Sequence, residues 1–505
     1  MHIMSKINIV FAVALSLMLF VSCGYSPSVP DVFSKSNEYP DIYPDYRNVT
    51  IPYNIAPLNF ALNGDYENCV ARFSYPNGEY VCGNGNKIII AIDEWKDMLQ
   101  KSVGKNIKVE VYAETSDKWV SFVPFYLTVV EDPIDQYISY RVIQPSYVAY
   151  ELLSINQRDL TNFDETQIYN NMLVSDENNG QCINCHSYKN YKTDNMQFHM
   201  RQGNGGTVIV NNGVAKKVDL KTDSTLSAGV YPSWHPTKNY IAYSTNLTGQ
   251  SFHTKDAQKV EVQDTKSDLI LYDVDANEVS IISALDNELE IYPWWAPDGK
   301  TLYFGAAFFE YKDTVSNETE SISRYKEVKY DLYRKSFDPE SKKFGERELV
   351  FSASSINKSA TLPRVSPDGR YLMFSMGEWG CFHIWHHDSD IYLMDLVTKN
   401  VRKLENVNSD SSESYHSWSS NGRWMIISSR RNDNNYTRPF IAYFDKKGFA
   451  HKAFELPQED PEHHLYFTRS YNIPEFMIEP VKITPQEFTS TAKSKAIKAK
   501  YVNNK

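Results

Sequence analysis

Four stretches in the second half of the chain repeat one another, and this repetition constrains the fold more than any other feature. They read YPSWHPTKNYIAYST from Tyr231, YPWWAPDGKTLYFGA from Tyr292, LPRVSPDGRYLMFSM from Leu362 and YHSWSSNGRWMIISS from Tyr415. Each contains a short strand, a turn of the Pro-Asp-Gly kind and an apolar strand, and two further strands follow. Four antiparallel strands per repeat are typical of a β-propeller blade. We therefore expect a β-propeller over residues 201–480 with six blades, five or seven being the alternatives.

The remaining sequence predicts smaller units in a mainly β chain. Short alternating runs such as KIIIAI, IKVEVYAE and WVSFVPFYLTVV indicate a β-sandwich-like domain over residues 50–135. The content of 35 Tyr and 25 Phe agrees with this, because aromatic residues favour pleated, half-buried surfaces. Residues 136–200 form a less regular connecting segment, and residues 481–505 are expected to be a solvated, Lys-rich tail.

The N-terminus has the layout of an export signal. Lys6 precedes an apolar run that ends in FVSC, and this ending resembles a bacterial lipobox with Cys23 as the lipidated residue. An ordinary signal peptide that happens to contain a cysteine is the alternative. Residues 1–23 would then be the lipoprotein signal peptide and residues 24–49, rich in Pro, Ser, Tyr and Asp, a linker. We expect an exported protein that its lipid anchors to the periplasmic or outer face of a bacterial membrane.

Net charge and motif content limit the function classes. The formal net charge of −11 argues against a nucleic-acid partner, since phosphate backbones are bound by cationic surfaces. The G-x-S-x-G elbow of propeller peptidases is absent, so hydrolase activity is not expected. An envelope protein or a glycan is the expected partner.

One motif could carry chemistry: Cys182-Ile183-Asn184-Cys185-His186 has the CxxCH spacing of a haem c attachment site. Two thiols add to the haem vinyl groups across a helix-like turn, and the adjacent imidazole becomes the proximal iron ligand. Cys182 and Cys185 would be the thioether anchors and His186 the fifth ligand. The nearby run NMQFHMRQ offers sixth ligands, namely Met196, Met200 and His199.

Other interpretations of this motif stay open. In an exported protein, Cys182 and Cys185 could form a structural disulfide without a cofactor. A zinc site would need a fourth ligand, and the chain has no second CxxC. A thioredoxin-like dithiol would need a βαβ context, which the sequence lacks.

Two further cysteines, Cys69 and Cys82, flank a predicted hairpin with a Pro-Asn-Gly turn. The sequence predicts a disulfide across this hairpin, two buried free thiols being the alternative. Cys381 is left over and is expected to be buried.

Two clusters in the repeat region are candidate binding loops. The run GEWGCFHIWHHDSD holds His383, His386 and His387, and could form a ligand, metal or partner site. The more ordinary interpretation is a loop anchored by its aromatic residues. The run SSRRNDNNYTRPF brings Arg430, Arg431 and Arg438 together, which could bind a carboxylate or phosphate, although salt bridges between blades are the commoner role.

The repeats resemble the WD40-like PD40 repeats of TolB-type propellers, with SPDGRYLMFS and APDGKTLYFG as the nearest matches. The chain also resembles Bacteroidetes-type lipoproteins described as TolB-like or as cytochrome c-related, through CINCHSYKNY, FHIWHHDSDIYLMDL, ESYHSWSSNGRWMIISSRRND and SYNIPEF. The resemblance implies a propeller and suggests haem.

Two functions follow from these observations. The first is an exported lipoprotein that carries haem c on a propeller, for electron transfer or redox sensing. The second is a non-enzymatic envelope module that binds a protein or glycan, in which CxxCH is a structural disulfide.

Overall fold

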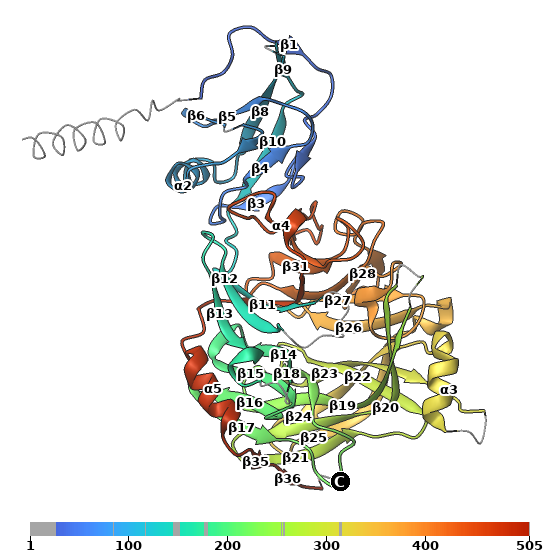
Figure 1. Cartoon of the computed structure of the whole chain (residues 1–505). Helices are drawn as coiled ribbons and strands as arrows, with labels where there is room; N and C mark the ends of the chain where they lie inside the picture. Colours follow the sequence, from blue (N-terminus) through green and yellow to red (C-terminus); the bar gives the residue numbers. More distant parts are fainter. Residues whose placement is uncertain are drawn as a thin grey trace, which may run out of the picture.

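The computed structural model describes residues 27–503, except residues 84, 117, 145–151, 176–179, 254, 256–257 and 313–315. The structure is mainly β, as predicted, and has a smaller N-terminal unit beside a larger body of repeated sheets (Figure 1). In the part of the chain that is described, no helix is long and apolar enough to cross a membrane. The export signal and Cys23 lie outside the described residues.

The N-terminal unit contains two sheets and one helix. The larger sheet has the order β1-β9-β8-β10-β3, with β5 paired to β8 and β6, and the smaller one has the order β2-β4-β7. The strands are β1 (Ser34–Lys35), β2 (Ile42–Tyr43), β3 (Thr50–Pro52), β4 (Phe60–Leu62), β5 (Asn68–Tyr75), β6 (Gly78–Cys82), β7 (Lys87–Ile88), β8 (Asn106–Thr115), β9 (Lys118–Ser121) and β10 (Phe125–Val130).

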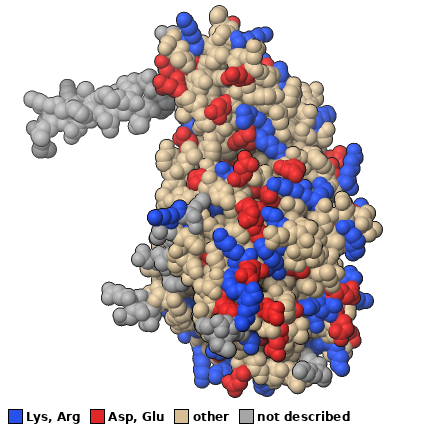
Figure 2. Space-filling view, turned by 90° about the vertical axis from the view of Figure 1, so that its right-hand side faces the viewer, with Lys and Arg blue, Asp and Glu red and all other residues tan. Residues whose placement is uncertain are grey.

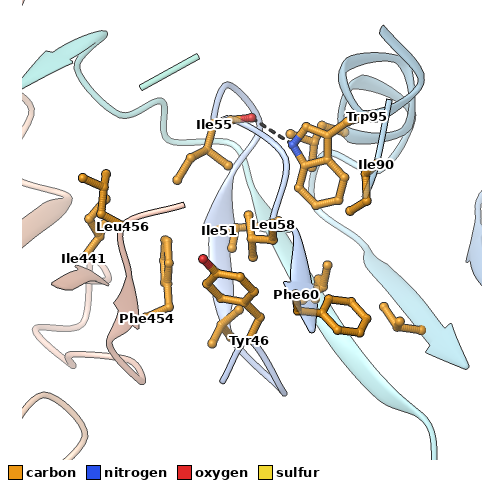
Figure 3. Close-up of a cluster of buried hydrophobic side chains, with 14 of the residues drawn as sticks. Tyr46, Ile51, Ile55, Leu58, Phe60, Ile90, Trp95, Ile441, Phe454 and Leu456 are labelled. Atoms are coloured by element: carbon orange, nitrogen blue, oxygen red, sulfur yellow. Dashed lines mark hydrogen bonds between the residues drawn. The ribbon is translucent and has the colours of Figure 1, made fainter. Parts of the chain in front are cut away.

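The predicted linker over residues 24–49 is therefore partly folded. Its strands β1 and β2 pair with β9 and β4, which brings both into the sheets of the N-terminal unit. Helix α2 (Ile92–Lys101) was not predicted, and it buries Trp95, Met98 and Leu99. The Trp95 indole donates a hydrogen bond to the Ile55 carbonyl at 2.9 Å (Figure 3).

The larger body consists of four-stranded antiparallel meanders arranged like the blades of a β-propeller. In each, the chain runs through four neighbouring strands in order. The first two meanders are β14 (Gln181–Lys189), β15 (Lys192–Gln202), β16 (Gly206–Asn211) and β17 (Val214–Asp219), and then β18 (Val230–Trp234), β19 (Tyr240–Phe252), β20 (Val260–Asp273) and β21 (Glu278–Ser283). The third is β22 (Glu288–Trp295), β23 (Thr301–Phe308), β24 (Asp331–Asp338) and β25 (Lys343–Phe351). The last two are β26 (Ser359–Val365), β27 (Tyr371–Gly377), β28 (Asp390–Asp395) and β29 (Val401–Lys403), and then β30 (Glu413–Trp418), β31 (Trp424–Ser429), β32 (Arg438–Tyr443) and β33 (Phe454–Glu455).

One further sheet joins the two ends of this body. Its order is β13-β12-β11-β34, so that the late strand β34 (Ser470–Met477) pairs antiparallel with the early strand β11 (Tyr137–Ile143). The other two strands are β12 (Ser154–Asp159) and β13 (Glu165–Asn170). The segment predicted as a connection, residues 136–200, thus belongs to the repeated body.

The predicted solvated tail is folded as well. Helix α5 (Pro485–Lys493) begins with a capping box between Thr484 and Glu487 and buries Phe488 and Ala492. After it, β35 (Ile497–Lys498) pairs with β17 and β36 (Lys500–Tyr501) pairs with β21. The remaining short helices are η1 (Asn171–Leu173), α3 (Asn317–Ser323), η2 (Tyr325–Glu327), η3 (Ser354–Ile356), η4 (His383–Trp385) and α4 (His463–Tyr466).

The N-terminal unit and the meander β30–β33 share one hydrophobic core. Ile441 and Phe454 are buried in the same cluster as Tyr46 and Ile51 (Figure 3). Trp424 belongs to this cluster as well. The Trp424 indole also donates to the Asp132 carbonyl at 3.2 Å. This shared apolar core fixes the small unit against the side of the larger body. On the face shown in Figure 2, basic and acidic side chains are interspersed.

Candidate functional site

The innermost strands bend at equivalent points, and these points surround the centre of the repeated body. At each point one residue has a positive φ, and the pairing register with the neighbouring strand shifts, as in a β-bulge. The residues are Cys185 (55°), Tyr231 (50°), Tyr292 (54°), Leu362 (56°), Tyr415 (34°) and Ile473 (53°). We call these residues the collar. All of them line one cavity of only about 40 Å³, which has room for a few water molecules.

The cysteine and histidine of CxxCH are one copy of a repeated dipeptide. A proline follows the collar residue in four strands, as Pro232, Pro293, Pro363 and Pro474. A histidine follows it in the other two, as His186 after Cys185 and His416 after Tyr415. Cys185-His186-Ser187 is therefore the counterpart of Tyr415-His416-Ser417. The sequence contained this signal, because NCHSYKNY can be aligned with SYHSWSSN, but the CxxCH spacing concealed it.

The CxxCH residues do not fit a covalently attached haem. They lie in the extended strand β14, whereas attachment through two thiols requires a helix-like turn. Cys185 and His186 are 2% and 1% exposed and face the small collar cavity, while Cys182 lines a separate cavity. The two thiols and the imidazole thus do not surround a common space that could hold a porphyrin.

The predicted sixth ligands also lie elsewhere. Met196 and Met200 are buried on β15 in an apolar cluster with Phe198. His199, on the same strand, is hydrogen-bonded through Nδ1 to the Thr207 hydroxyl at 3.0 Å. Burial lowers the pKa of His199 to about 3, as it does for His186. None of the three ligand candidates lines the collar cavity.

A larger cavity of about 300 Å³ lies on the side of the collar where the innermost strands begin. We call it the mouth cavity. Two arginines reach it from neighbouring sheets, Arg141 on β11 and Arg201 on β15. No Asp or Glu is among the described residues that line it. The other lining residues are Ile143, Cys182, Asn184, His199, Ser227, Ala228, Val230, Tyr231, Asn246, Thr248, Gln250, Val262, Phe382 and Tyr415.

The two arginines of the mouth cavity are held by weak or neutral acceptors. Arg141 is 4% exposed and donates to the Ile183 carbonyl at 3.2 Å. Arg201 donates to the Cys182 sulfur at 3.5 Å. No Asp or Glu of the described residues lines this space, and Arg201 forms no ion pair with one of them, so its positive charge can attract an acidic group. Sequence reasoning missed both arginines, since they come from strands far apart in the chain and form no local motif.

A third cavity, of about 360 Å³, lies on the opposite side of the collar. We call it the aromatic cavity, because Trp234, Trp294, Trp295 and Trp418 line it. Its arginine, Arg364, forms an ion pair with Glu475 at 2.9 Å and lies 3.9 Å above the Trp294 ring. Burial raises the pKa of Glu475, and Arg364 acts in the opposite direction.

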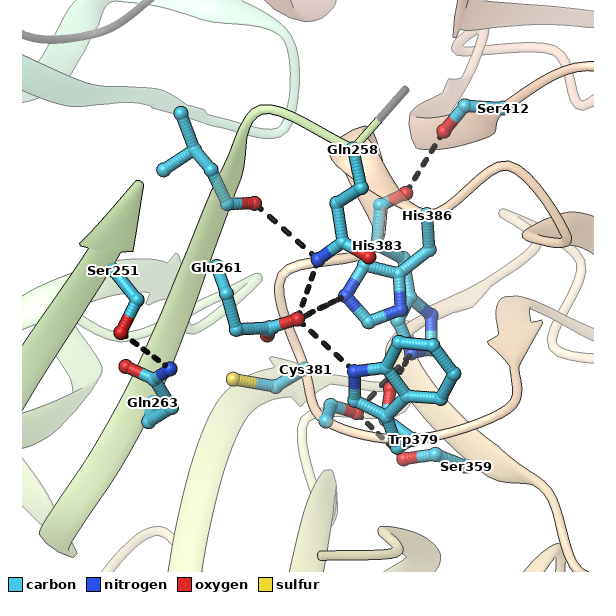
Figure 4. Close-up of polar contacts among 12 residues, drawn as sticks. Ser251, Gln258, Glu261, Gln263, Ser359, Trp379, Cys381, His383, His386 and Ser412 are labelled. Atoms are coloured by element: carbon cyan, nitrogen blue, oxygen red, sulfur yellow. Dashed lines mark hydrogen bonds and ion pairs between the residues drawn. The ribbon is translucent and has the colours of Figure 1, made fainter. Parts of the chain in front are cut away.

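The histidine-rich loop is anchored inside the protein. His383 and His386 are each 1% exposed, whereas His387 is exposed. His386 Nε2 pairs with Glu261 at 3.1 Å, and the Trp379 indole donates to the same carboxylate at 3.0 Å (Figure 4). The His383 ring is within hydrogen-bonding distance of the Thr361 and Ser375 hydroxyls, both at 3.2 Å. The two buried histidines therefore fix the loop, and they do not form an open site.

The arginine cluster also has structural contacts. The Arg430 guanidinium lies 3.4 Å above the Trp385 ring and donates to the Ile384 carbonyl at 2.6 Å. Arg431 pairs with Glu413 at 3.1 Å. Arg438 donates to the carbonyls of Arg469, His464 and Phe467.

The described cysteines are free thiols. Cys69 and Cys82 are buried and unbonded, in contrast to the predicted disulfide. The hairpin register explains this, because Ala71 and not Cys69 lies opposite Cys82. Cys182, Cys185 and the buried Cys381 are free as well, so the structural disulfide at CxxC is not formed. Among the described residues, no group of three or more His, Cys, Asp or Glu side chains is placed to hold a metal ion.

No protein-family model matches the chain, and no curated protein matches it. Among solved structures, it is similar to an apocarotenoid oxygenase mutant from Synechocystis, with a TM-score of 0.36 and 10% identity over 84% of this chain and 95% of that one. Prolyl oligopeptidase B from Galerina marginata gives a TM-score of 0.36 and 9% identity over 77% of this chain, which spans only 44% of that enzyme. A DUF4784 family protein from Bacteroides caccae gives a TM-score of 0.28 and 10% identity over 73% of this chain and 95% of that one. Similarity this low carries no argument about function.

Proposed function

We propose that the protein is a non-enzymatic binding module whose mouth cavity takes a small ligand bearing a carboxylate or phosphate group. The observation that carries this proposal is Arg201, which forms no ion pair with a described carboxylate and lies in a cavity that no Asp or Glu of the described residues lines. In a chain with a net charge of −11, such a local excess of positive charge is a selective feature.

The chemistry of the lining agrees with such a ligand. A guanidinium group binds a carboxylate or phosphate through parallel N–H donors, and each charged hydrogen bond contributes about 1.5–3 kcal/mol. The side chains of Asn184, Ser227 and Gln250 supply neutral donors and acceptors around the arginines. The volume of about 300 Å³ is at the lower end of the range for small-molecule sites.

The architecture that we propose for this module is a six-bladed propeller. The pairing of β34 with β11 supports it, because a late strand that completes an early sheet would close the ring. The Pro-Asp-Gly turns support the relation to PD40 repeats of the TolB type: Gly299 and Gly369 have φ values of 63° and 75°, as these turns require.

We further propose that the protein is exported and lipid-anchored at Cys23, as the sequence FVSC suggests. The ligand group would then belong to an envelope glycan or to an envelope protein. Haem c and electron transfer are not part of this proposal, because the CxxCH side chains surround no common space. An absorption spectrum of protein made in a host that assembles c-type haem should lack a Soret band, and a band would restore the haem hypothesis.

Calorimetric titration tests the binding proposal. Acetate, succinate, glucuronate, inorganic phosphate and glucose 6-phosphate are titrated at 50 mM and 500 mM salt, so that carboxylate and phosphate sources are compared. We expect at least one anion to bind, more weakly at high salt, and Arg201→Gln to reduce its affinity about 10-fold or more. Arg334→Gln, which alters a remote arginine paired with Glu348, is the matched control. The proposal is wrong if no anion binds, or if both variants bind alike.

A further inference from the structure

The strands that carry the collar present a further layer of side chains, two residues after each collar residue. This inner layer consists of Ser187, Ser233, Trp294, Arg364, Ser417 and Glu475, one from each strand, and all six line the aromatic cavity. The next residue along the strand is Trp234, Trp295 or Trp418 in three of the strands, and these tryptophans are buried in the cores between neighbouring sheets. Because successive residues of a strand face opposite sides, the inner layer can vary without altering those cores.

Half of the inner layer is small. Ser233 Oγ accepts a hydrogen bond from the backbone N–H of Trp295 at 3.0 Å, and the Ser417 hydroxyl donates to the Pro474 carbonyl at 3.0 Å. Each of these two serines thus joins its strand to the next innermost strand, β18 to β22 and β30 to β34. A serine also occupies the equivalent position at residue 187. The three small side chains leave space in the cavity that larger residues would fill.

The other half of the inner layer holds three large side chains that contact one another. The Arg364 guanidinium lies 3.9 Å above the Trp294 ring, and its Nη2 donates to Glu475 Oε1 at 2.9 Å. Among the described residues, neither Arg364 nor Glu475 has a side-chain nitrogen or oxygen that is both buried and unpaired. The remaining N–H groups of Arg364 and the Oε2 of Glu475 are therefore accessible from the cavity that these residues line.

The chemistry of these three side chains favours an uncharged ligand. Arg364 attracts an anion and Glu475 repels it, and for a cation the two effects are reversed. A guanidinium group beside a carboxylate can bind two neighbouring hydroxyl groups, since the first donates hydrogen bonds and the second accepts them. An indole ring packs against C–H groups, because its face carries partial negative charge. A sugar ring supplies both features, with hydroxyl groups around its edge and C–H groups on its faces.

From this arrangement we propose that the aromatic cavity is a second binding site, which takes a neutral pyranose sugar. Neighbouring hydroxyls of the sugar bind Arg364 and Glu475, and its ring packs against the half-buried Trp294. The cavity volume of about 360 Å³ is within the range of small-molecule sites, and exposed residues such as Asn190 and Thr237 among its lining open it to solvent. This site goes beyond the anion site and is separate from it, because the two cavities share no lining residue.

Matched ligands test this site directly. Calorimetric titration compares the methyl pyranosides of glucose, galactose, mannose and N-acetylglucosamine with cyclohexanol and glycerol. Cyclohexanol has the ring without neighbouring hydroxyls, and glycerol has neighbouring hydroxyls without the ring. We expect at least one pyranoside to bind about 10-fold or more tightly than both of these alcohols. Its affinity should be the same at 50 mM and 500 mM salt, because salt screens interactions with charged ligands and this ligand is neutral.

Variants show where the sugar binds. Trp294→Ser introduces the residue that three strands already have at this position, so we expect the variant to fold. It should weaken sugar binding about 10-fold or more and leave anion binding unchanged. Trp119→Ser, which removes a half-buried indole from β9 of the N-terminal unit, is the matched control. Arg364→Lys is the second variant if Trp294→Ser does not fold. It should also weaken sugar binding, because lysine keeps the charge but lacks the planar set of donors.

The outcomes distinguish the sugar site from the anion site. If no pyranoside binds, or if Trp294→Ser binds the sugar as the wild type does, the sugar site is wrong whatever the result for anions. Sugar binding that is lost in Arg201→Gln and kept in Trp294→Ser would place the sugar in the mouth cavity and overturn this inference. A tetraproline peptide is titrated as well, because aromatic grooves also bind proline-rich segments. Tighter binding of this peptide than of every pyranoside would contradict a sugar site.

Discussion

The two cavities on either side of the collar differ in which groups balance the positive charge of their arginines. In the aromatic cavity, Arg364 is paired with Glu475 and stacked on Trp294, so its charge is used within the protein. In the mouth cavity, Arg141 donates to a backbone carbonyl and Arg201 to a thiol, and none of the described residues that line the space is an Asp or Glu. The same repeated framework thus has a neutralised end and a positively charged end. At the second end, we propose that the charge of Arg201 serves a ligand.

The largest effect is expected at the neutralised end. Arg364→Gln leaves the half-buried Glu475 without its partner, and breaking such an ion pair costs up to about 3 kcal/mol. Urea unfolding should show this loss of stability, while affinity for the anion stays unchanged. Arg201→Gln should have the reverse profile, with reduced affinity and nearly unchanged stability. If Arg364→Gln weakened anion binding as strongly as Arg201→Gln, the two ends would not be independent.

The second effect concerns pH, and the two ends should respond in opposite directions. Burial holds His199, at the mouth, at a pKa of about 3, below its unfolded value. As pH falls from about 6.5 towards 3, His199 is protonated in the unfolded chain before it is protonated in the folded chain. The free energy of unfolding therefore decreases over this range. Glu475 has a raised pKa, and its contribution is present at low pH and lost as pH rises.

Stability measured by urea unfolding between pH 3.5 and 7.5 checks this difference. His199→Asn should flatten the acid side of the profile by up to about 1.4 kcal/mol per pH unit. Glu475→Gln should flatten the opposite side. Identical profiles for both variants and the wild type would show that neither group is linked to folding.

The smallest effect is expected at the collar between the two cavities. His186→Pro places at this position the residue found at Pro232, Pro293, Pro363 and Pro474. We expect a change in unfolding free energy within about 1 kcal/mol, and the same for His416→Pro. Unfolding of His186→Pro alone, with His416→Pro tolerated, would mean that His186 has a role beyond the repeat.

The collar and the cavities differ in how far the sequence predicts them. The repeats from Tyr231, Tyr292, Leu362 and Tyr415 predicted the strand–turn–strand units, because turn chemistry and alternation are local. The copy at Cys185 was concealed by its CxxCH spacing, which imitates a cofactor motif. The folded segments 34–43 and 485–501 were also missed, since their strands are very short and are stabilised by distant partners.

The mouth cavity could not be predicted for a different reason. Arg141, Arg201 and Asn246 lie on three strands that only the tertiary fold brings together. The buried pair Glu261–His386 shows the same limitation. The sequence predicts His386 as a candidate ligand, but its partner Glu261 is more than a hundred residues away in the chain.

An anomalous difference map tests the central contrast most directly. Crystals are soaked in 3-bromopropionate, a carboxylate whose bromine can be located without ambiguity. The account predicts a bromine peak in the mouth cavity beside Arg141 and Arg201, lost in crystals of Arg201→Gln, and none beside Arg364. A peak in the aromatic cavity with an empty mouth cavity would contradict it.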